Sequence, residues 1–214
     1  MYDMVTKPRL SRVDPDTRRD DIVAKASQLF LDEGFAATSM STIARAVGGS
    51  KATLYKYFPT KEALFEAVMD ARARAVLTPI GDATVPRDDP AAFLRAVGER
   101  LLTGIYAPEP MALNRVVVGD GFRAPDIAVA FFRMGPDPVK QLIADQLARF
   151  AAEGRLSCGD PVTAAEDFCA LLRGEAHFRA LAGERMPPDG TEIDAHVDRI
   201  VGLVLSLWCN SNAG

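Results

Sequence analysis

The 214-residue sequence has few of the residues that bind metals or form disulfides, with two histidines and three cysteines. The cysteines, Cys158, Cys169 and Cys209, are odd in number and show no Cys-x-x-Cys spacing. This pattern argues against a disulfide framework and for a reducing compartment. We expect the cysteines to serve as small apolar residues, with a redox switch at Cys158, in a predicted loop, as the alternative.

The sequence also lacks the common catalytic motifs. It contains no glycine-rich phosphate loop, no serine nucleophile elbow and no His-Glu-x-x-His pair. A helical di-iron site would need two Glu-x-x-His motifs. Instead, Glu175-x-His177 has the wrong spacing and Glu192-x-x-x-His196 stands alone. We therefore expect no metal, no cofactor and no enzymatic activity.

No stretch of the sequence is long and apolar enough to span a bilayer. The longest apolar run, residues 200–209, is about half of the required length. The first twenty residues are charged and hold no apolar run, so we expect no secretory signal. Hydrophobic residues make up 48% and charged residues 25%, which is ordinary for a soluble protein. We expect a cytoplasmic protein of one large or two modest domains that does not bind membranes.

Acidic residues are missing from one stretch of the chain. Residues 38–61 carry four basic residues and no acidic one, although the whole chain has a net charge of -4. From residue 71 to the end there are 15 basic and 19 acidic residues. Because DNA phosphates attract basic surfaces, a short basic region on an acidic chain indicates a protein that touches DNA with a small part of its surface.

Apolar residues recur at helical spacing along most of the chain. Residues 1–16 carry two prolines and mixed charge without periodicity, so we predict a flexible arm there. The remainder predicts an all-α fold of about nine or ten helices, in which residues 115–118 are the one short candidate for a strand. Residues 17–62 would form a helix-turn-helix domain of three helices, and residues 63–214 a larger helical domain. The helices predicted in the second half lie at residues 89–107, 109–123, 125–134, 137–154, 161–183 and 191–209.

Two short helices near the N-terminus have the pattern of a helix-turn-helix. Ser39 and Ser50 are plausible N-caps, and a Gly48-Gly49 turn separates the two helices. Leu54 and Phe58, four residues apart, would anchor the second helix from behind. The opposite face would then present polar side chains to the DNA major groove, with Ser50 and the backbone N–H groups of the helix N-terminus near a phosphate.

The stretch from Ser41 to Leu64, STIARAVGGSKATLYKYFPTKEAL, resembles the DNA-binding domain of TetR-family regulators. The resemblance extends over residues 22–69, and Gly49 departs from it, because the family usually has a small apolar residue there. It implies that Ser39 and Ser41 contact phosphates, as do the hydroxyls of Tyr55 and Tyr57, and that Lys61 clamps the DNA backbone. The residues expected to face base edges or the groove wall are Lys51, Ala52, Thr53 and Lys56. Tyr57 lies near the inward face, so packing is the alternative for it.

The remaining helices, by the same resemblance, hold an effector pocket and a dimer interface. Residues 134–183 also resemble, more loosely, the C-terminal domain of AcrR/AefR-like members. The predicted pocket residues, which at helical spacing also suit an ordinary core, are Phe93, Val97, Leu101, Ile105, Met111, Val117, Phe122, Phe131, Phe132 and His177. The predicted dimer residues form apolar stripes on the last two helices and are Phe168, Leu172, Val197, Ile200, Val201, Val204, Leu205 and Trp208.

These patterns predict a homodimeric transcription repressor that binds a palindromic DNA operator and is released by a small apolar or aromatic effector. The helix that begins at Lys61 belongs to both parts, so an effector that tilts it would change the spacing of the two recognition helices. Two alternatives remain at this point. The chain could be a helical protein-interaction module without DNA binding, or an activator of the same family.

Overall fold

The computed structural model describes residues 15–209, and in this range the chain forms ten α-helices and no β-strand. The helices are α1 (Pro15–Glu33), α2 (Met40–Ala46), α3 (Lys51–Tyr57), α4 (Lys61–Gly81), α5 (Pro90–Tyr106), α6 (Pro108–Asp120), α7 (Pro125–Met134), α8 (Pro136–Ala152), α9 (Pro161–Leu181) and α10 (Gly190–Cys209). The all-α prediction is confirmed, and the strand candidate at residues 115–118 lies inside α6. The predicted arm lies outside the described residues except for residues 15 and 16, which begin α1. Proline suits that first helical position because its missing N–H has no partner there anyway.

The helices begin where the sequence supplies a cap. A serine, threonine or aspartate side chain at the N-cap accepts a hydrogen bond from a backbone N–H of the first turn in six helices. These caps are Ser39 of α2, Ser50 of α3, Thr60 of α4, Asp89 of α5, Asp160 of α9 and Asp189 of α10. From α6 to α10 the predicted bounds lie within three residues of the observed ones, because proline or a cap marks each start.

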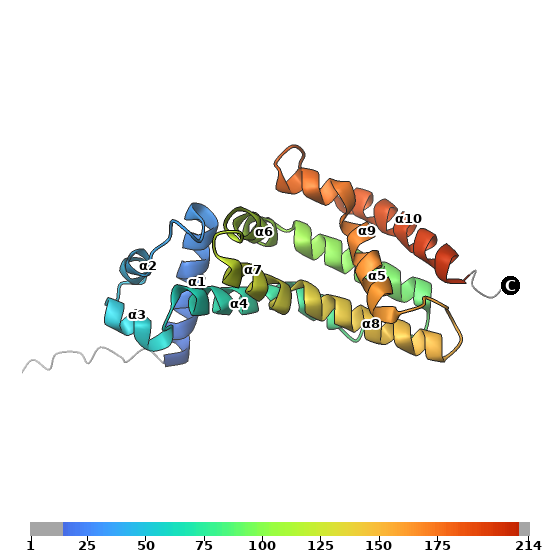
Figure 1. The fold of residues 1–214 in the computed structure, drawn as a ribbon, viewed down its shortest axis with the longest axis horizontal. Helices are drawn as coiled ribbons and strands as arrows, with labels where there is room; N and C mark the ends of the chain where they lie inside the picture. The colour runs from blue at the N-terminus through green and yellow to red at the C-terminus, as the bar shows by residue number, and fades with distance from the viewer. Residues whose placement is uncertain (1–14, 210–214) are drawn as a thin grey trace, which may run out of the picture.

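The molecule is elongated, with α1, α2 and α3 at one end and most of α8, α9 and α10 toward the other (Figure 1). Two hydrophobic cores follow this division. The N-terminal core is centred on the aromatic side chains of Phe30, Phe35 and Phe65, whose ring centroids lie 5.2–5.5 Å apart. Helix α4 contributes to both cores. It runs without a break through residues 62–63, where the sequence predicts the boundary between the two domains, and the position of that boundary remains a prediction.

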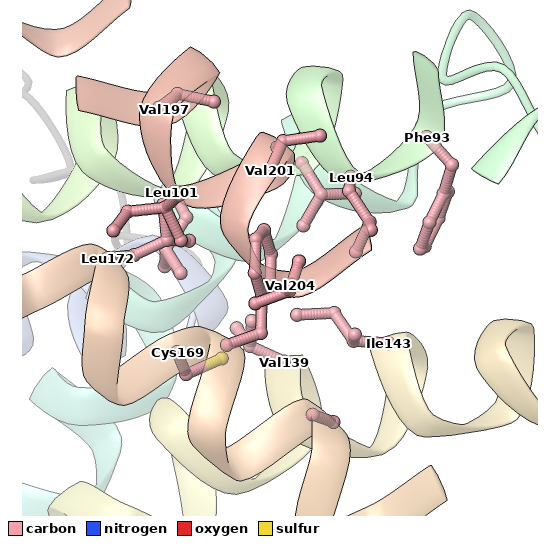
Figure 2. Packing of buried hydrophobic residues seen from close by; sticks show 14 of the residues in the cluster. Phe93, Leu94, Leu101, Val139, Ile143, Cys169, Leu172, Val197, Val201 and Val204 are labelled. Carbon is pink, nitrogen blue, oxygen red and sulfur yellow. The ribbon is translucent and has the colours of Figure 1, made fainter. Parts of the chain in front are cut away.

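The C-terminal core buries most of the side chains predicted for the dimer interface. Helix α10 packs its Val197, Val201 and Val204 against Leu94 of α5 and the middle of α9, as Figure 2 shows. Seven of the eight predicted interface residues are at most 8% exposed within one chain, and the eighth packs against the same core. The seven are Phe168, Leu172, Val197, Ile200, Val201, Val204 and Trp208, and the eighth is Leu205. The prediction chose the larger of two apolar faces, and that face is the one the chain buries for itself.

Candidate nucleic-acid interface and ligand cavity

A tight turn connects α2 and α3. Gly48 adopts a left-handed conformation (φ 64°), and its N–H donates to the carbonyl of Arg45 at 3.1 Å. The N–H of Gly49 donates to the carbonyl of Ala44 at 3.0 Å. This pair of bonds satisfies the last carbonyls of α2, and the positive φ explains why glycine stands at position 48.

Gly49 leaves room for a side chain from α1. The guanidinium of Arg18 donates to the carbonyl of Val47 at 2.8 Å, and a Cβ at position 49 would lie 3.1 Å from Arg18 Nη2. The departure from the family pattern at Gly49 is therefore compensated by an arginine that ties α1 to the turn. The sequence pattern around Gly49 does not indicate this arginine, because its contact lies 29 residues away along the chain.

Helix α3 presents a polar, basic face. Leu54 and Phe58 are 1% and 3% exposed and hold the helix against the N-terminal core. Of the residues predicted to contact DNA, seven are exposed on α3 or at the starts of α2 and α3: Ser39, Ser41, Ser50, Lys51, Ala52, Tyr55 and Lys56. Thr53 and Tyr57 are partly buried, and Tyr57 packs against the N-terminal core. The surface thus has the size, charge and helical shape that a major groove accepts.

Lys61 differs from its predicted role as a clamp on DNA. Its Nζ donates to the backbone carbonyls of Phe35 at 2.7 Å and Thr38 at 3.0 Å, and it lies 4.1 Å from the centroid of the Phe35 ring. Two of the three ammonium protons therefore hold the loop between α1 and α2 onto the start of α4. The lysine stabilises the helix-turn-helix from within.

A cavity of about 290 Å³ lies between α4, α5, α6, α7, α8 and α9. Five predicted pocket residues line it: Leu101, Ile105, Phe131, Phe132 and His177. The other five do not line it. Phe93, Val97 and Met111 are buried in the C-terminal core, Val117 is buried in the N-terminal core, and Phe122 is 99% exposed. Periodicity identified the apolar residues of α5, α6 and α7, but it could not say which of them face a hollow.

The polar wall of the cavity includes residues that sequence reasoning missed. Arg72 of α4, Asn114 of α6, Lys140 of α8 and Arg173 of α9 all line it. A signal for Arg173 was present in the sequence, because Arg173 and His177 are four residues apart, a spacing that would place both on one face of a straight helix. An arginine and a histidine at that spacing in a largely apolar helix indicate that the helix meets something polar.

His177 is 8% exposed, and its Nε2 lies 3.2 Å from the side-chain amide of Asn114. Its ring lies edge-on to Tyr106, with centroids 5.7 Å apart. Burial, and then the charge of Arg173, lower the pKa of His177 below its ordinary value, so the ring is neutral at pH 7. Cys169, also on the wall, has its pKa raised to about 11 by burial and contributes a protonated, apolar thiol.

No cluster of three or more His, Cys, Asp or Glu side chains that could hold a metal occurs within residues 15–209. Over the same residues, none of the helices is both long enough and apolar enough to cross a membrane.

A capped helix-turn-helix with a basic outer face, joined by a shared helix to a hollow helical domain, defines a DNA-binding transcription regulator. The chain belongs to the TetR family. Residues 22–68 match the model of bacterial regulatory proteins of the tetR family, and residues 92–209 match the AefR-like transcriptional repressor C-terminal domain. Proteins of this family are regulators, and the chain is accordingly not an enzyme.

Several known proteins are similar over nearly the whole chain. The HTH-type transcriptional regulator EthR of Mycolicibacterium smegmatis is 31% identical over 96% of this chain and 91% of its own length. The solved structure of the flavonoid-responsive regulator FrrA is 30% identical with a TM-score of 0.79, and the comparison covers 92% of this chain and 99% of that one. A TetR-family regulator from Pseudomonas syringae pv. tomato is 28% identical with a TM-score of 0.69, covering 91% and 98%.

Two further relatives match over part of their length. The HTH-type transcriptional activator FasR of Mycolicibacterium smegmatis is 33% identical over 42% of each protein. The HTH-type transcriptional repressor ComR of Escherichia coli is 44% identical over 24% of this chain and 25% of its own length. This chain therefore spans well under half of each of these two relatives.

Proposed function

We propose that the chain is a homodimeric repressor in the cytoplasm that binds a palindromic operator and is released when a small, largely apolar effector enters the cavity. One observation carries the proposal: helix α4 belongs to the DNA-binding end and to the cavity. Its first turns, with Leu64, Phe65 and Val68, pack in the N-terminal core. Its next turns, with Ala73 and Val76, line the cavity. A ligand that displaces α4 therefore displaces the helix-turn-helix as well.

Arg72 strengthens this connection. From the cavity wall its guanidinium forms an ion pair with Glu109 of α6. Its Nε and Nη2 lie 3.2 and 3.1 Å from the hydroxyl of Ser27 in α1, which is 2% exposed. One side chain thus joins the cavity to α1, α4 and α6. A ligand that changed the position of Arg72 would therefore also disturb its hydrogen bonds to α1, the helix that supports the recognition helix.

Helix α6 supplies a second connection. Near its middle, Asn114 lines the cavity, and Arg115 donates to the carbonyls of Ala180 and Leu181 at the end of α9. At its end, Asp120 accepts a hydrogen bond of 2.9 Å from the N–H of Ala36, in the loop before α2. A shift of α6 in response to ligand would therefore pull on the loop that positions α2.

The dimer is proposed to form through the outer faces of α9 and α10. Because the inner face of α10 is buried within the chain, the apolar side chains left for a partner are the outward ones. Leu171, Phe178, Leu203 and Leu207 are 37%, 71%, 42% and 62% exposed. Exposed apolar surface of this kind on adjacent helices is typical of an isologous interface. Two recognition helices would then be spaced for two half-sites about 34–36 Å apart.

The proposal is tested by selecting duplexes from a random pool with the purified full-length protein and measuring the salt dependence of the winners. A palindromic consensus with a steep salt slope supports a dimeric DNA-binding regulator. If the folded protein enriches no sequence from the pool, the alternative of a helical protein-interaction module without DNA binding is favoured. Release of the protein from the selected duplex is measured with a ligand that binds in the cavity. Binding in the cavity is established by Ile105→Trp, a substitution that fills the cavity and should abolish ligand binding. If the ligand-saturated protein holds the duplex as tightly as the ligand-free protein, the repressor-release mechanism is wrong.

An activator of the same family is the second candidate, and the similarity to the activator FasR favours it over part of the chain. The match to the AefR-like repressor domain covers more of the chain, residues 92–209, and favours repression. A reporter gene placed behind the selected operator separates the two. Expression that rises when the regulator is deleted indicates repression, and expression that falls indicates activation.

A further inference from the structure

The cavity wall carries charge of one sign. Its described lining side chains include three cations, Arg72, Lys140 and Arg173, and no aspartate or glutamate. The rest of the wall is mainly aliphatic and aromatic. An unpaired charge beside an apolar cavity is unfavourable. Whether each cation is already paired with a carboxylate therefore determines whether the cavity favours an anionic ligand.

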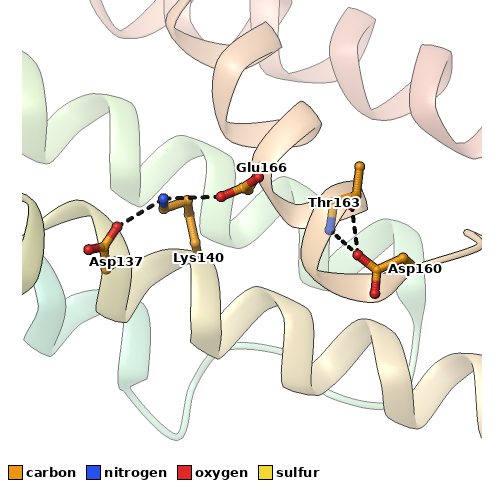
Figure 3. Close-up of polar contacts among 5 residues, drawn as sticks. All are labelled: Asp137, Lys140, Asp160, Thr163 and Glu166. Carbon is orange, nitrogen blue, oxygen red and sulfur yellow. Dashed lines mark hydrogen bonds and ion pairs between the residues drawn. The ribbon is translucent and has the colours of Figure 1, made fainter.

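Two of the three cations are already neutralised by carboxylates outside the wall. Arg72 is paired with Glu109. Lys140 lies between Asp137 at 2.9 Å and Glu166 at 3.4 Å, as Figure 3 shows. The hydrogen bond to Asp137 raises the pKa of Lys140 against the opposing effect of burial, so this lysine stays charged and paired. Neither cation needs a ligand to balance it.

Arg173 has no such partner. Its Nε donates to the carbonyl of Cys169 in its own helix at 3.2 Å. Among residues 15–209, no acceptor lies within hydrogen-bond distance of Nη1 or Nη2, and no carboxylate lies within ion-pair distance. The side chain is partly buried on the cavity wall. Its guanidinium therefore offers two NH₂ groups that no described residue satisfies.

His177, four residues further along α9, also lines the cavity. Its Nε2 lies 3.2 Å from the side-chain amide nitrogen of Asn114. Nδ1 is buried and has no hydrogen-bond partner, the one such side-chain atom in the described part of the chain. Buried polar groups without partners are rare in folded proteins, and the unsatisfied NH₂ groups of Arg173 on the cavity wall indicate a missing anionic acceptor.

Gly174 explains how α9 presents these groups. Its backbone (φ 51°, ψ -163°) breaks the helix between Arg173 and His177, and α9 bends there. This conformation is essentially restricted to glycine. Arg173 and His177 therefore stand on either side of a kink in the cavity wall.

We infer that the cavity binds an apolar organic monocarboxylate, with the carboxylate at Arg173 and the hydrocarbon body among the aliphatic and aromatic side chains of α4, α5 and α7. The assignment rests on the proposed function only in taking this cavity as the effector site. A carboxylate is favoured over a phenol because an ordinary phenol is protonated at neutral pH. The volume is about twice the ~150 Å³ that accommodates benzene in an apolar protein cavity, which suits a two-ring or medium-chain acid.

Calorimetric titration of the full-length protein with matched biphenyl compounds tests the inference. The probes are biphenyl-4-carboxylate, its neutral amide, 4-phenylphenol and biphenyl-4-ylmethylammonium. The wild type is expected to bind the carboxylate about tenfold or more tightly than the amide, since hydrogen bonds to charged groups are the stronger ones. Arg173→Gln should reduce this ratio to about threefold or less, and Arg173→Lys should restore part of it.

Arg149→Gln is the matched control. Arg149 also donates to a backbone carbonyl, that of Arg87, and it does not line the cavity. This variant should keep the full preference for the carboxylate, and thermal melts should show that all three variants fold.

Equal binding of the amide, tighter binding of the ammonium compound, or no binding of any probe would overturn the inference. A preference that survives in Arg173→Gln would overturn the role of Arg173. The proposed function fails separately: carboxylate binding that leaves operator affinity unchanged contradicts release but supports the assignment. Release of the operator by a neutral compound alone supports the function and contradicts the assignment.

Discussion

Lys51 and Lys61 lie at opposite ends of the same basic stretch, and their surroundings give them different tasks. Lys51 is exposed at the first position of α3, and among residues 15–209 its ammonium has no hydrogen-bond or ion-pair partner that would compete with a phosphate. Lys61 is partly buried and holds the carbonyls of Phe35 and Thr38. The family resemblance gives both lysines a DNA contact, Lys51 at the base edges or groove wall and Lys61 at the backbone, whereas in the structure Lys61 makes internal hydrogen bonds.

Replacing each lysine by alanine separates these tasks. Lys61→Ala should lower the free energy of unfolding by about 1–3 kcal/mol, because two charged hydrogen bonds are lost. Lys51→Ala should change it by less than about 0.5 kcal/mol and lower the salt slope of duplex binding by about one. Urea unfolding and duplex titrations at several salt concentrations measure both. An unchanged urea midpoint in Lys61→Ala would show that its internal contacts do not stabilise the fold.

Arg18 and Gly49 should be energetically coupled, because a Cβ at position 49 would lie 3.1 Å from the guanidinium. Gly49→Ala should displace Arg18 from the carbonyl of Val47 and destabilise the protein by about 1 kcal/mol. In the Arg18→Gln background the same substitution should have a smaller effect, with an interaction energy of roughly 0.5 kcal/mol or more. Additive effects in thermal unfolding of the four proteins would show that the two residues act independently.

The faces of α3 could be predicted from sequence because two anchors, Leu54 and Phe58, fix the rotation of a short helix. The partners of Lys61 and Arg18 could not, because both side chains bind backbone carbonyls. Every residue carries a carbonyl, so no residue type marks such a contact in advance.

At the scale of the helix, α9 was predicted as one segment, residues 161–183, and it is kinked at Gly174. A single glycine within a helical pattern is compatible with a straight helix or a bend. The positions of the caps and prolines could be predicted, because they act within a few residues. The kink could not be predicted, since a glycine permits a bend but does not require one.

Gly174→Ala tests the kink. An alanine at this backbone conformation is expected to lower the free energy of unfolding by about 1–3 kcal/mol. Gly81→Ala, at the end of α4 in open space and without a positive φ, is the control and should cause no loss. Chemical unfolding of the two variants compares them directly. If both glycines tolerate alanine equally well, the bend in α9 is not set by Gly174.

Helix α6 is expected to pass the ligand signal through Asp120. Asp120→Ala removes the acceptor for the N–H of Ala36 and should leave ligand affinity unchanged, because Asp120 does not line the cavity. The factor by which ligand weakens duplex binding should fall several-fold. Asp126→Ala, on the neighbouring α7, is the control. Full release in Asp120→Ala would exclude this route.

For the whole molecule, the sequence predicts an interface on α9 and α10, and most of the side chains predicted for it are buried within one chain. A helix that is apolar nearly all round offers two candidate faces, and periodicity alone does not say which one a second chain covers. Exposure in the folded chain separates them. The outer face, with Leu203 and Leu207, is the one available to a partner.

Leu207→Glu should therefore convert the dimer to a monomer, because it places a charge on that face. Val129→Glu, at a position on α7 that is 61% exposed against 62% for Leu207, should leave the dimer intact. Sedimentation equilibrium over a range of protein concentrations distinguishes the two. A dimer that persists in Leu207→Glu would place the interface elsewhere.

Reciprocal linkage between operator and ligand tests the central claim that the cavity and the recognition helix share one conformational equilibrium. The measurement is the affinity of a cavity ligand for the protein alone and for the protein saturated with its selected operator. Operator is expected to weaken ligand binding by the same factor by which ligand weakens operator binding, within a range of roughly 5–150-fold. Equal ligand affinity for the free and the operator-bound protein would contradict it.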